Sequence, residues 1–461
     1  MTGPGSGHIL DAMTALARRV ALSLVALALL QCSPAPEPLP VTPPPSVVVV
    51  SLDTLRADHL GCYGYHRDTS PNIDAFAKDG ILFERAYAPM STTLPSHISL
   101  FTSLNPLQHG VLRNFQYLKT ALSTSDDLRT AAQMFAGEGY QTGGFVSCAP
   151  LMSHSGIAVG FDAYDEPTGS LRPAQKTIDG ALQWLKSTDD RPLFLWVHLF
   201  DPHQPYRPPE EFVDSFSTDE GLLRFLKARN VKPTETVLTN NNDYDGSILY
   251  LDSQLERLFD ELKARGLYDS SAIVLVGDHG EGLGQHGWMD HGPIYDEDLH
   301  VPLILKLPAD EGRVGERNPA LAAMIDVLPT LVETLQLPFK PTDQEQFSGI
   351  NLLGDGPERR YVFSQRVVRK RRWDDGLKFS LTGRRWKYYH LTEGNDQLFD
   401  LRDDPAESRN VIEQQPVVAE KMSRTLLETI QDSEQLGRGL GEESALPPEV
   451  VEALESLGYV R

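Results

Sequence analysis

Short apolar runs, rich in β-branched residues, recur along the chain and alternate with segments of helical pattern. The clearest runs are continuous, as in strands that are buried on both faces; they cover residues 46–53, 142–147, 192–198, 272–278 and 301–306. Between the runs at 192–198 and 272–278, residues 244–262 place apolar side chains three and four positions apart, on one helical face. Strands that alternate with helices predict a mostly parallel central sheet with helices on both faces.

The pattern changes after about residue 345. Residues 360–365, 377–383 and 384–392 are typical of short antiparallel strands, and a helical pattern follows from about residue 417 to 430. We therefore predict two domains. The first, over 47–345, is an α/β catalytic domain, and the second, over 346–461, is a smaller α+β subdomain with an antiparallel sheet.

The N-terminus is typical of an exported protein. Residues 20–30 form an apolar run of 11 residues behind two arginines, which is too short to span a bilayer but suits a signal peptide. The run ends in LLQC at Cys32 and resembles a bacterial lipobox, in which the cysteine is acylated. We expect a signal peptide over 1–32, a proline-rich linker over 33–46, and a periplasmic or cell-envelope lipoprotein anchored at Cys32. An uncleaved single-span anchor is the alternative.

The charge of the chain limits its possible binding partners, and its few cysteines limit the disulfide bonds it can form. Asp and Glu number 64 against 42 Lys and Arg, which gives a net charge of −22 and argues against nucleic acid, whose phosphates require basic residues. Three cysteines do not form a disulfide framework, and we expect Cys62 and Cys148 to be buried as apolar residues.

Three of the predicted strands end in side chains that could carry chemistry. These residues are Asp53, His198 and Asp278. Because ligands of open α/β sheets bind at the carboxyl ends of the strands, we expect them to converge in one crevice. His279 follows Asp278, and a carboxylate beside an imidazole can bind a divalent metal. The alternative is an aspartate that only caps a loop.

Two loops add further candidates. In HLFDPHQPY, flanking prolines hold His203 in a stiff segment, which suits a proton donor. In STTLPSHIS, Thr93 precedes Pro95 at the start of a helical pattern. Thr93 is therefore either a helix cap or, beside a metal, a nucleophile.

These segments together resemble the sulfatase family, within the alkaline phosphatase superfamily. The matching segments occur in the family's order and cover nearly everything from Val47 to Arg461. They are SLDTLRADHLGCYGY, TSPNIDAFAKDGILFERAYAP, TLPSHISLFTSLNPLQHGV, GYQTGGFV with GFDAYDE, HLFDPHQPY, GDHGEGLGQHG with HGPIYDEDLHVPLIL, and LFDLRDDPAESRNV. The resemblance implies an alkaline-phosphatase-like α/β sandwich.

The resemblance places Thr93 at the position of the family's nucleophile. Sulfatases carry a Cys or Ser there that is oxidised to formylglycine, whereas threonine has a methyl group on its β-carbon and cannot be converted. No formylglycine is expected. Threonine can act as a nucleophile when a metal lowers its pKa, and the site resembles phosphodiesterases and phosphoethanolamine transferases that use Thr with an Asp-His pair.

The resemblance also implies a ligand set for one divalent metal. Asp53, Asp278, His279 and the Thr93 oxygen would hold it. An imidazole ligand favours Mn²⁺ or Zn²⁺, and the oxygen ligands leave Ca²⁺ as an alternative.

The remaining site residues would handle the substrate. His203, or as the less favoured choice His198, would protonate the leaving alcohol. His97, which replaces the arginine of the family motif, would contact the ester oxygens with Asn114 and His291. Such contacts require positively charged imidazoles, so activity should fall at high pH.

We therefore expect a hydrolase that cleaves sulfate or phosphate esters of a small molecule, glycan or lipid through a covalent intermediate on Thr93. Formylglycine releases sulfate by breaking its own C–O bond, whereas a threonine ester requires attack at sulfur or phosphorus, which favours phosphate. One alternative is a phosphodiesterase or a transferase of phosphoethanolamine or phosphoglycerol. Another is a non-catalytic surface protein that binds ligands on the same fold.

Overall fold

The computed structural model describes residues 44–114, 128–356, 358–368, 376–391 and 395–437. The signal peptide, Cys32 and nearly all of the linker predicted above lie outside these residues. In the part of the chain that is described, no helix has the length and apolar character needed to cross a membrane. The domain boundary near residue 345 stays a prediction.

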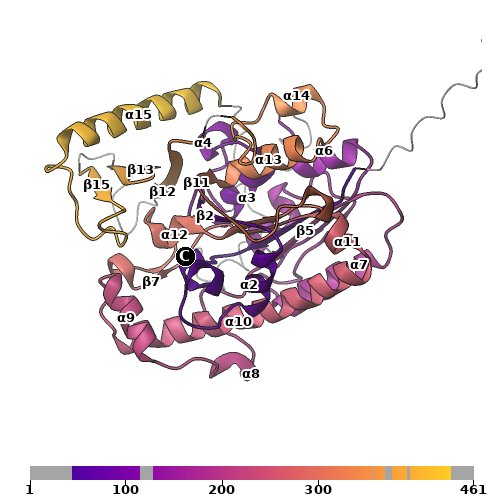
Figure 1. Ribbon diagram of the computed structural model, residues 1–461, viewed down its shortest axis with the longest axis horizontal. Coiled ribbons are helices and arrows are strands. Elements are labelled where there is room, and N and C mark those ends of the chain that lie inside the picture. The colour runs from indigo at the N-terminus through magenta and orange to yellow at the C-terminus, as the bar shows by residue number, and fades with distance from the viewer. Residues whose placement is uncertain (1–43, 115–127, 357, 369–375, 392–394, 438–461) are drawn as a thin grey trace, which may run out of the picture. The chain divides into compact units, whose positions relative to one another are not determined.

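A mixed, mostly parallel sheet forms the centre of the fold (Figure 1). Its strands, in spatial order, are β11 (Glu316–Ala323), β2 (Ile81–Tyr87), β10 (Leu303–Lys306), β6 (Ala272–Gly277), β1 (Val47–Leu52), β5 (Leu193–Leu199), β3 (Gln141–Phe145) and β4 (Ala163–Asp165). β10 runs antiparallel to both of its neighbours, and β9 (His300–Val301) pairs antiparallel with β2. The other pairings are parallel, which confirms the predicted fold class.

The central strand β1 explains why its sequence is apolar without alternation. Val47 and Val49 pack into the core on one face of the sheet, and Val48 and Val50 pack into the core on the other. A strand that buries both faces has no polar side, so its residues read as one continuous run.

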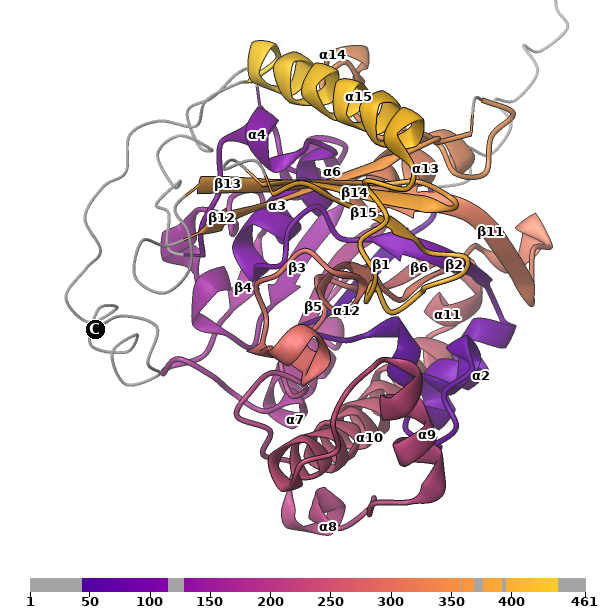
Figure 2. The same cartoon turned by 90° about the vertical axis from the view of Figure 1, so that its left-hand side faces the viewer.

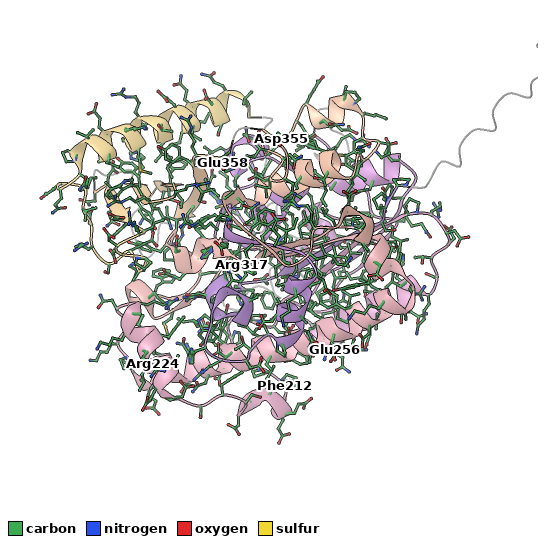
Figure 3. All side chains as sticks on the ribbon, viewed as in Figure 1. Phe212, Arg224, Glu256, Arg317, Asp355 and Glu358 are labelled. Atoms are coloured by element: carbon green, nitrogen blue, oxygen red, sulfur yellow. The ribbon has the colours of Figure 1, made fainter. Side chains whose placement is uncertain are left out.

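Helices cover both faces of the sheet, as Figure 1 shows. On one face lie α2 (Pro71–Lys78), α7 (Ala174–Leu185) and α10 (Glu235–Ala264). On the other lie α3 (Thr93–Thr102), α6 (Ala131–Gly137) and α13 (Val327–Thr334). Charged side chains such as Arg224 and Glu256 project outward from the helices around this core (Figure 3).

A buried carboxylate joins two of these helices. Asp252 on α10 accepts hydrogen bonds from the amide groups of Asn72 and Ile73, at 2.9 and 2.8 Å, and so holds the first turn of α2. Asp252 is fully buried, and this burial raises its pKa to about 6. The contact therefore orders the start of α2, but at neutral pH it requires a desolvated carboxylate at Asp252.

The C-terminal part contains the predicted antiparallel sheet. Its strands are β12 (Val362–Val368), β13 (Gly376–Thr382), β14 (Trp386–Leu391) and β15 (Gln397–Asp400), paired in that order. The helix α15 (Pro416–Gln435) lies along this sheet (Figure 2) and packs Met422 and Leu426 against it. The strands and helix predicted for this part are confirmed.

A buried lysine links the C-terminal sheet to the short helix α12 (Asp296–Leu299). Lys387 on β14 is fully buried, and its Nζ lies 2.6 Å from Asp296 and 3.0 Å from Glu407. Asp296 begins the short helix α12. The ion pairs therefore hold the start of α12 against the sheet.

The remaining elements are short. They are α4 (Pro106–His109), α8 (Glu210–Val213), α9 (Glu220–Ala228), α11 (Leu267–Ser270), α12 (Asp296–Leu299), α14 (Pro341–Gln344), and the hairpin of β7 (Gly282–Leu283) and β8 (Met289–Asp290).

Candidate active site

The carboxyl ends of three neighbouring strands build the floor of the site. Because β1 lies between β5 and β6, residues that follow or end these strands are brought together. The amide of Asp53 donates to Leu199 O of β5 at 2.9 Å, and the amide of Asp278 donates to Leu52 O of β1 at 3.2 Å. The structure thus brings Asp53, His198 and Asp278 together in one cluster of buried side chains.

Thr93 is the first residue of α3 and lies over this floor. Its Oγ1 is 3.3 Å from Asp53 Oδ2 and 3.4 Å from His279 Nε2. The side chain of the N-cap residue, Thr92, makes no capping hydrogen bond. The Thr93 hydroxyl therefore points toward the aspartate and histidine rather than capping its own helix.

The side chains around Thr93 have the composition and orientation of a metal site. Ligand atoms of Asp53, Asp278 and His279 lie within 4.8 Å of one another. Among the described residues, Asp53 Oδ1 and Asp278 Oδ2 are buried and have no hydrogen-bond partner. His279 Nδ1–H donates to Gly280 O at 2.9 Å, which leaves the lone pair of Nε2 directed at Thr93. Two buried, unpaired carboxylates are costly without a cation, so these residues fit a divalent ion.

The electrostatics agree with this fit. Burial raises the pKa of Asp53, and burial together with the charge of Asp53 raises the pKa of Asp278 well above its usual value. Burial lowers the pKa of His279 well below the usual value, so its imidazole is neutral and able to coordinate. A cation between these groups would restore the ionised form of both carboxylates.

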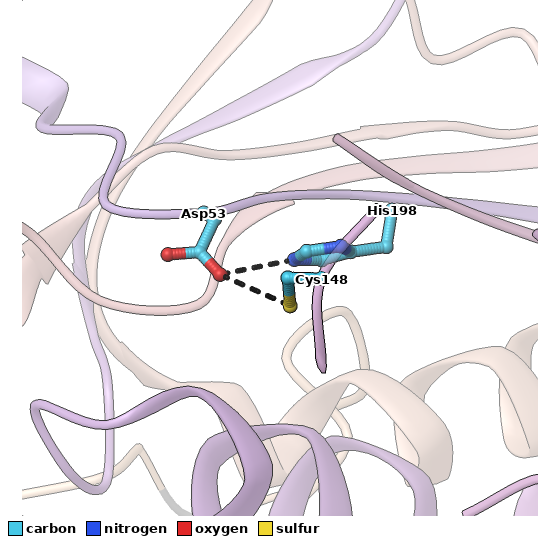
Figure 4. Close-up of side chains that lie close together, drawn as sticks. All are labelled: Asp53, Cys148 and His198. Atoms are coloured by element: carbon cyan, nitrogen blue, oxygen red, sulfur yellow. Dashed lines mark hydrogen bonds and ion pairs between the residues drawn. The ribbon is translucent and has the colours of Figure 1, made fainter. Parts of the chain in front are cut away.

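His198 and Cys148 contact the same oxygen of Asp53, Oδ2, that Thr93 contacts; Figure 4 shows these two side chains with Asp53. His198 Nε2 lies 3.2 Å from Asp53 Oδ2, and its Nδ1 accepts the Ser147 amide at 3.4 Å. Nε2 therefore carries the proton and donates to Asp53, so His198 orients a candidate ligand. Cys148 Sγ lies 4.0 Å from the same oxygen, and burial raises the pKa of its thiol. Cys148 is buried, as predicted, but nothing in the sequence indicated its contact with Asp53.

His203 and His291 face each other beside the cluster of side chains around Thr93. Their Nε2 atoms are 3.2 Å apart, and the His291 ring centroid is 4.5 Å from that of His279. His291 Nδ1 donates to Ser91 O at 3.0 Å, and His203 Nδ1 donates to Gln204 O. Since both Nδ1 atoms are used as donors, a hydrogen bond between the two Nε2 atoms forms only when one of the rings is protonated to a cation. Burial lowers the pKa of His203 and so opposes that protonation in the free protein.

His97 does not have the environment expected of a charged residue that contacts the substrate. Its Nδ1–H donates to Thr93 O, and its Nε2 accepts from Ser51 Oγ, both at 2.8 Å. Burial lowers the pKa of His97 to about 3, so the positive charge expected above is absent. The ring instead ties the start of α3 to β1, and both nitrogens are used inside the protein.

Asn114 also contacts the helix. Its Oδ1 accepts the amide of Leu94 at 2.9 Å, and the next residue, Pro95, has no amide hydrogen. Little of the first turn of α3 is therefore left to donate to a substrate. Asn114 fixes the turn that carries Thr93.

Comparison with known proteins decides the family. The Sulfatase family profile matches residues 45–337, which is more than half of the chain. The chain belongs to the sulfatase family. A second profile, described as N-sulphoglucosamine sulphohydrolase, C-terminal, matches residues 284–435 of this sulfatase. As a member of this family the protein is a sulfuric ester hydrolase by class, and the predicted resemblance is confirmed.

Individual relatives are distant. The sulfatase is 22% identical to an arylsulfatase of Clostridium perfringens over 443 residues, which covers 80% of this chain and 90% of the relative. The phosphonate monoester hydrolase of Agrobacterium radiobacter has a TM-score of 0.68 at 22% identity, and covers 84% of this chain and 96% of its own. A protein in complex with its substrate D-glucosamine-2-N,6-O-disulfate has a TM-score of 0.70 at 18% identity, with coverage of 87% and 100%. At these identities the structural matches establish the fold.

Proposed function

We propose that this sulfatase hydrolyses sulfate or phosphate esters with a divalent metal ion and with Thr93 as nucleophile. The observation that carries the proposal is the position of the Thr93 hydroxyl, 3.3 Å from Asp53 and 3.4 Å from His279 at the buried start of a helix. A residue that only caps a helix would not require both a carboxylate and an imidazole beside its hydroxyl.

Asp53, Asp278 and His279 would hold the ion, with the Thr93 oxygen as a further ligand. When bound, a divalent ion of this kind lowers the pKa of a coordinated hydroxyl and neutralises charge on an ester oxygen. His198 supports the set by donating to Asp53 Oδ2, and the backbone amides of Thr54 and His279 fix Asp278 Oδ1 at 3.1 and 2.7 Å.

Thr93 Oγ1 would attack the sulfur or phosphorus atom in line with the leaving alcohol. The attacking oxygen lies at the N-terminus of α3, where the helix dipole stabilises negative charge. Asn114 and His97 hold the backbone at this turn through Leu94 N and Thr93 O, so they are positioning residues for the nucleophile.

His203 and His291 would supply the proton for the leaving alcohol. A proton bound between their Nε2 atoms, 3.2 Å apart, would be within reach of the leaving oxygen, and the negative charge of the substrate would favour that protonation. After the alcohol leaves, the same pair can accept a proton from the water that attacks the Thr93 ester. This second step is needed because a threonine ester has no way to release the acid group by breaking its own C–O bond.

Phosphate or phosphonate esters form a second candidate class. The specific observation is Thr93 itself, since a phosphoryl group on threonine is released by attack at phosphorus without special chemistry. The structural likeness to a phosphonate monoester hydrolase is consistent with this class. A glycan alcohol is consistent with the neighbour that binds a glucosamine disulfate. Export to the periplasm or cell envelope, with a lipid at Cys32, belongs to the same proposal.

The proposal is tested with purified protein, metal analysis and a panel of aryl substrates. Sulfate, phosphate, phosphodiester and phosphonate esters are assayed with Mn²⁺, Zn²⁺ and Ca²⁺. We expect about one metal ion per chain, and we expect Thr93→Ala to lower kcat by at least about 10³-fold. Thr93→Ser, which removes only the methyl group, should stay within about tenfold of the wild type.

The Ser variant is the matched control for packing, because both variants lose the same buried methyl group. If Thr93→Ala keeps its activity, Thr93 is not the nucleophile. If the wild type binds no stoichiometric metal and turns over none of the esters, the protein is a binding protein on a sulfatase fold.

A further inference from the structure

The two carboxylate oxygens of Asp53 face two different sets of side chains. Because β1 lies between β5 and β6, the carboxylate that follows β1 has neighbours from both strands. Oδ1 lies 3.9 Å from His279 Nε2, which follows β6 and belongs to the ligand set proposed above. Oδ2 lies 3.2 Å from His198 Nε2 on β5 and 4.0 Å from Cys148 Sγ (Figure 4). The function proposed above gives the Cys148 thiol no role.

The order of the strands brings Cys148 to this carboxylate. β3 runs parallel to β5, and the chain continues past Phe145 at the end of β3 to Cys148, which forms a β-bridge with Leu171. The amide of Ser147 donates to His198 Nδ1 at 3.4 Å, and Ser147 Oγ donates to His198 O at 2.7 Å, so this segment is held beside the end of β5. The adjacent strands β1, β5 and β3 therefore supply a carboxylate, an imidazole and a thiol.

The three side chains have the chemistry and spacing of a site for a thiophilic metal ion. One ligand atom from each of Asp53, Cys148 and His198 lies within 4.8 Å of the other two, and all three residues are fully buried. In a tetrahedral zinc site, neighbouring ligand atoms are about 3.3–3.6 Å apart. The distance from Asp53 to His198 is close to this spacing, and the sulfur lies farther out by only about 0.5 Å. Thiolate ligands select Zn²⁺ over Mn²⁺ or Ca²⁺.

Thr93 offers a fourth ligand, because its Oγ1 lies 3.3 Å from Asp53 Oδ2. On binding, the thiol would lose its proton to solvent, as coordinated thiols do, and the imidazole proton would move from Nε2 of His198 to Nδ1. This shift breaks the hydrogen bond from the Ser147 amide, which at 3.4 Å is longer than a normal one and therefore weak. The ion would then contact the carboxylate and the hydroxyl that the proposed reaction requires.

We propose that Asp53, Cys148 and His198 form a second cation site, selective for thiophilic ions such as Cd²⁺ and excess Zn²⁺, that competes with the ligand set proposed above for the Asp53 carboxylate. An ion in this site draws Asp53 away from the ion that supports ester cleavage and binds the Thr93 oxygen, so it inhibits the reaction. The inhibition rests on the function proposed above, because both sites use Asp53 and Thr93. The bond between the ion and the thiolate does not rest on it.

The first test detects the metal–sulfur bond and does not depend on turnover. Cd²⁺ is the probe, because it prefers sulfur ligands as Zn²⁺ does and its bond to a thiolate has a charge-transfer band in the ultraviolet. The purified protein is loaded with Mn²⁺ and titrated with Cd²⁺, and the ultraviolet band is recorded together with the electron paramagnetic resonance signal of released Mn²⁺. We expect about one Cd²⁺ per chain to produce the band and to release about one Mn²⁺.

Three variants separate this site from other thiols. Cys62 is the other cysteine in the described part of the chain, and Cys62→Ser is the matched control for Cys148→Ser. The band should disappear in Cys148→Ser and remain in Cys62→Ser. His198→Gln keeps an amide that can donate to Asp53 but removes the imidazole nitrogen, so it should keep the band and require at least about tenfold more Cd²⁺. A band that came from Cys62 or Cys32 would persist in Cys148→Ser.

The second test measures inhibition with Mn²⁺ and an aryl ester, and compares each protein with its own rate in the absence of Cd²⁺. Half-inhibition should require at least about tenfold more Cd²⁺ in Cys148→Ser than in the wild type, and an unchanged concentration in Cys62→Ser. No band in the wild type, or a band that persists in Cys148→Ser, would overturn the site. A band without release of Mn²⁺ and without inhibition would overturn the competition for Asp53. A protein that shows the band dependent on Cys148 but cleaves no ester would refute the function proposed above and leave this site intact.

Discussion

Replacing Asp278 by Asn should make the protein more stable in the absence of metal, and added metal should remove most or all of that advantage. Asp53 and Asp278 are both fully buried next to each other, and Asp278 Oδ2 has no hydrogen-bond partner among the described residues. Asparagine keeps the Oδ1 acceptor for the amides of Thr54 and His279, at 3.1 and 2.7 Å, and removes the charge. The substitution therefore changes electrostatics more than packing.

The magnitudes follow from the same geometry. With metal removed at pH 8, the wild type must either keep a second buried charge or take up a proton at Asp278, whose pKa is raised by burial and by the charge of Asp53. Both cost stability, and the loss of that cost in the variant should stabilise the fold by about 1–4 kcal/mol. With metal at 100 times its Kd, the wild type should gain about 2.7 kcal/mol. Asp278→Asn lacks one ligand and should gain far less. The variant is then the more stable protein in chelator and loses most or all of that advantage in Mn²⁺.

The assay is urea unfolding at pH 8, in chelator and in Mn²⁺, for the wild type, Asp278→Asn and Asp355→Asn. Asp355 is an exposed aspartate at the surface (Figure 3), so its substitution should change neither value by more than about 0.5 kcal/mol. Our account of the metal site is refuted if Asp278→Asn is no more stable than the wild type in chelator. It is equally refuted if Mn²⁺ stabilises both proteins to the same extent.

In the central sheet, the sequence predicted the strands that bury both faces and missed those that do not. β1 and β6 are apolar throughout, so their pattern needs no knowledge of their neighbours. β2 contains the polar pair Glu84 and Arg85, and β11 at the edge of the sheet contains Pro319 and an irregular register with β2. Their place in the sheet is set by pairing with distant strands, which local periodicity does not encode.

For the site, the sequence indicated which residues meet, but not what each ring nitrogen contacts. Strand ends at Asp53 and Asp278 predict a common crevice, because strand direction alone brings them together. His97 and His198 look equivalent as histidines beside such a crevice. The environment separates them: His97 is a neutral tie between α3 and β1, and His198 donates to Asp53. Burial and hydrogen-bond partners decide these roles, and both depend on the full tertiary structure.

Two further predictions concern buried charges away from the crevice. Burial raises the pKa of Asp252 to about 6, so the folded state binds a proton at this carboxyl more tightly than the unfolded chain does. The contribution of Asp252 to the free energy of unfolding therefore falls as pH rises from about 4 to 6. The difference in urea unfolding between the wild type and Asp252→Asn should change by at most about 3 kcal/mol over that window, and a constant difference would contradict this. Lys387→Met should destabilise the protein by about 3–5 kcal/mol, because Asp296 and Glu407 would lose their buried cation, whereas the exposed Lys421→Met should not. A thermal melt of Lys387→Met that matches Lys421→Met would mean that the two carboxylates are protonated or reach water, and that this ion pair does not hold the C-terminal sheet against the α12 segment.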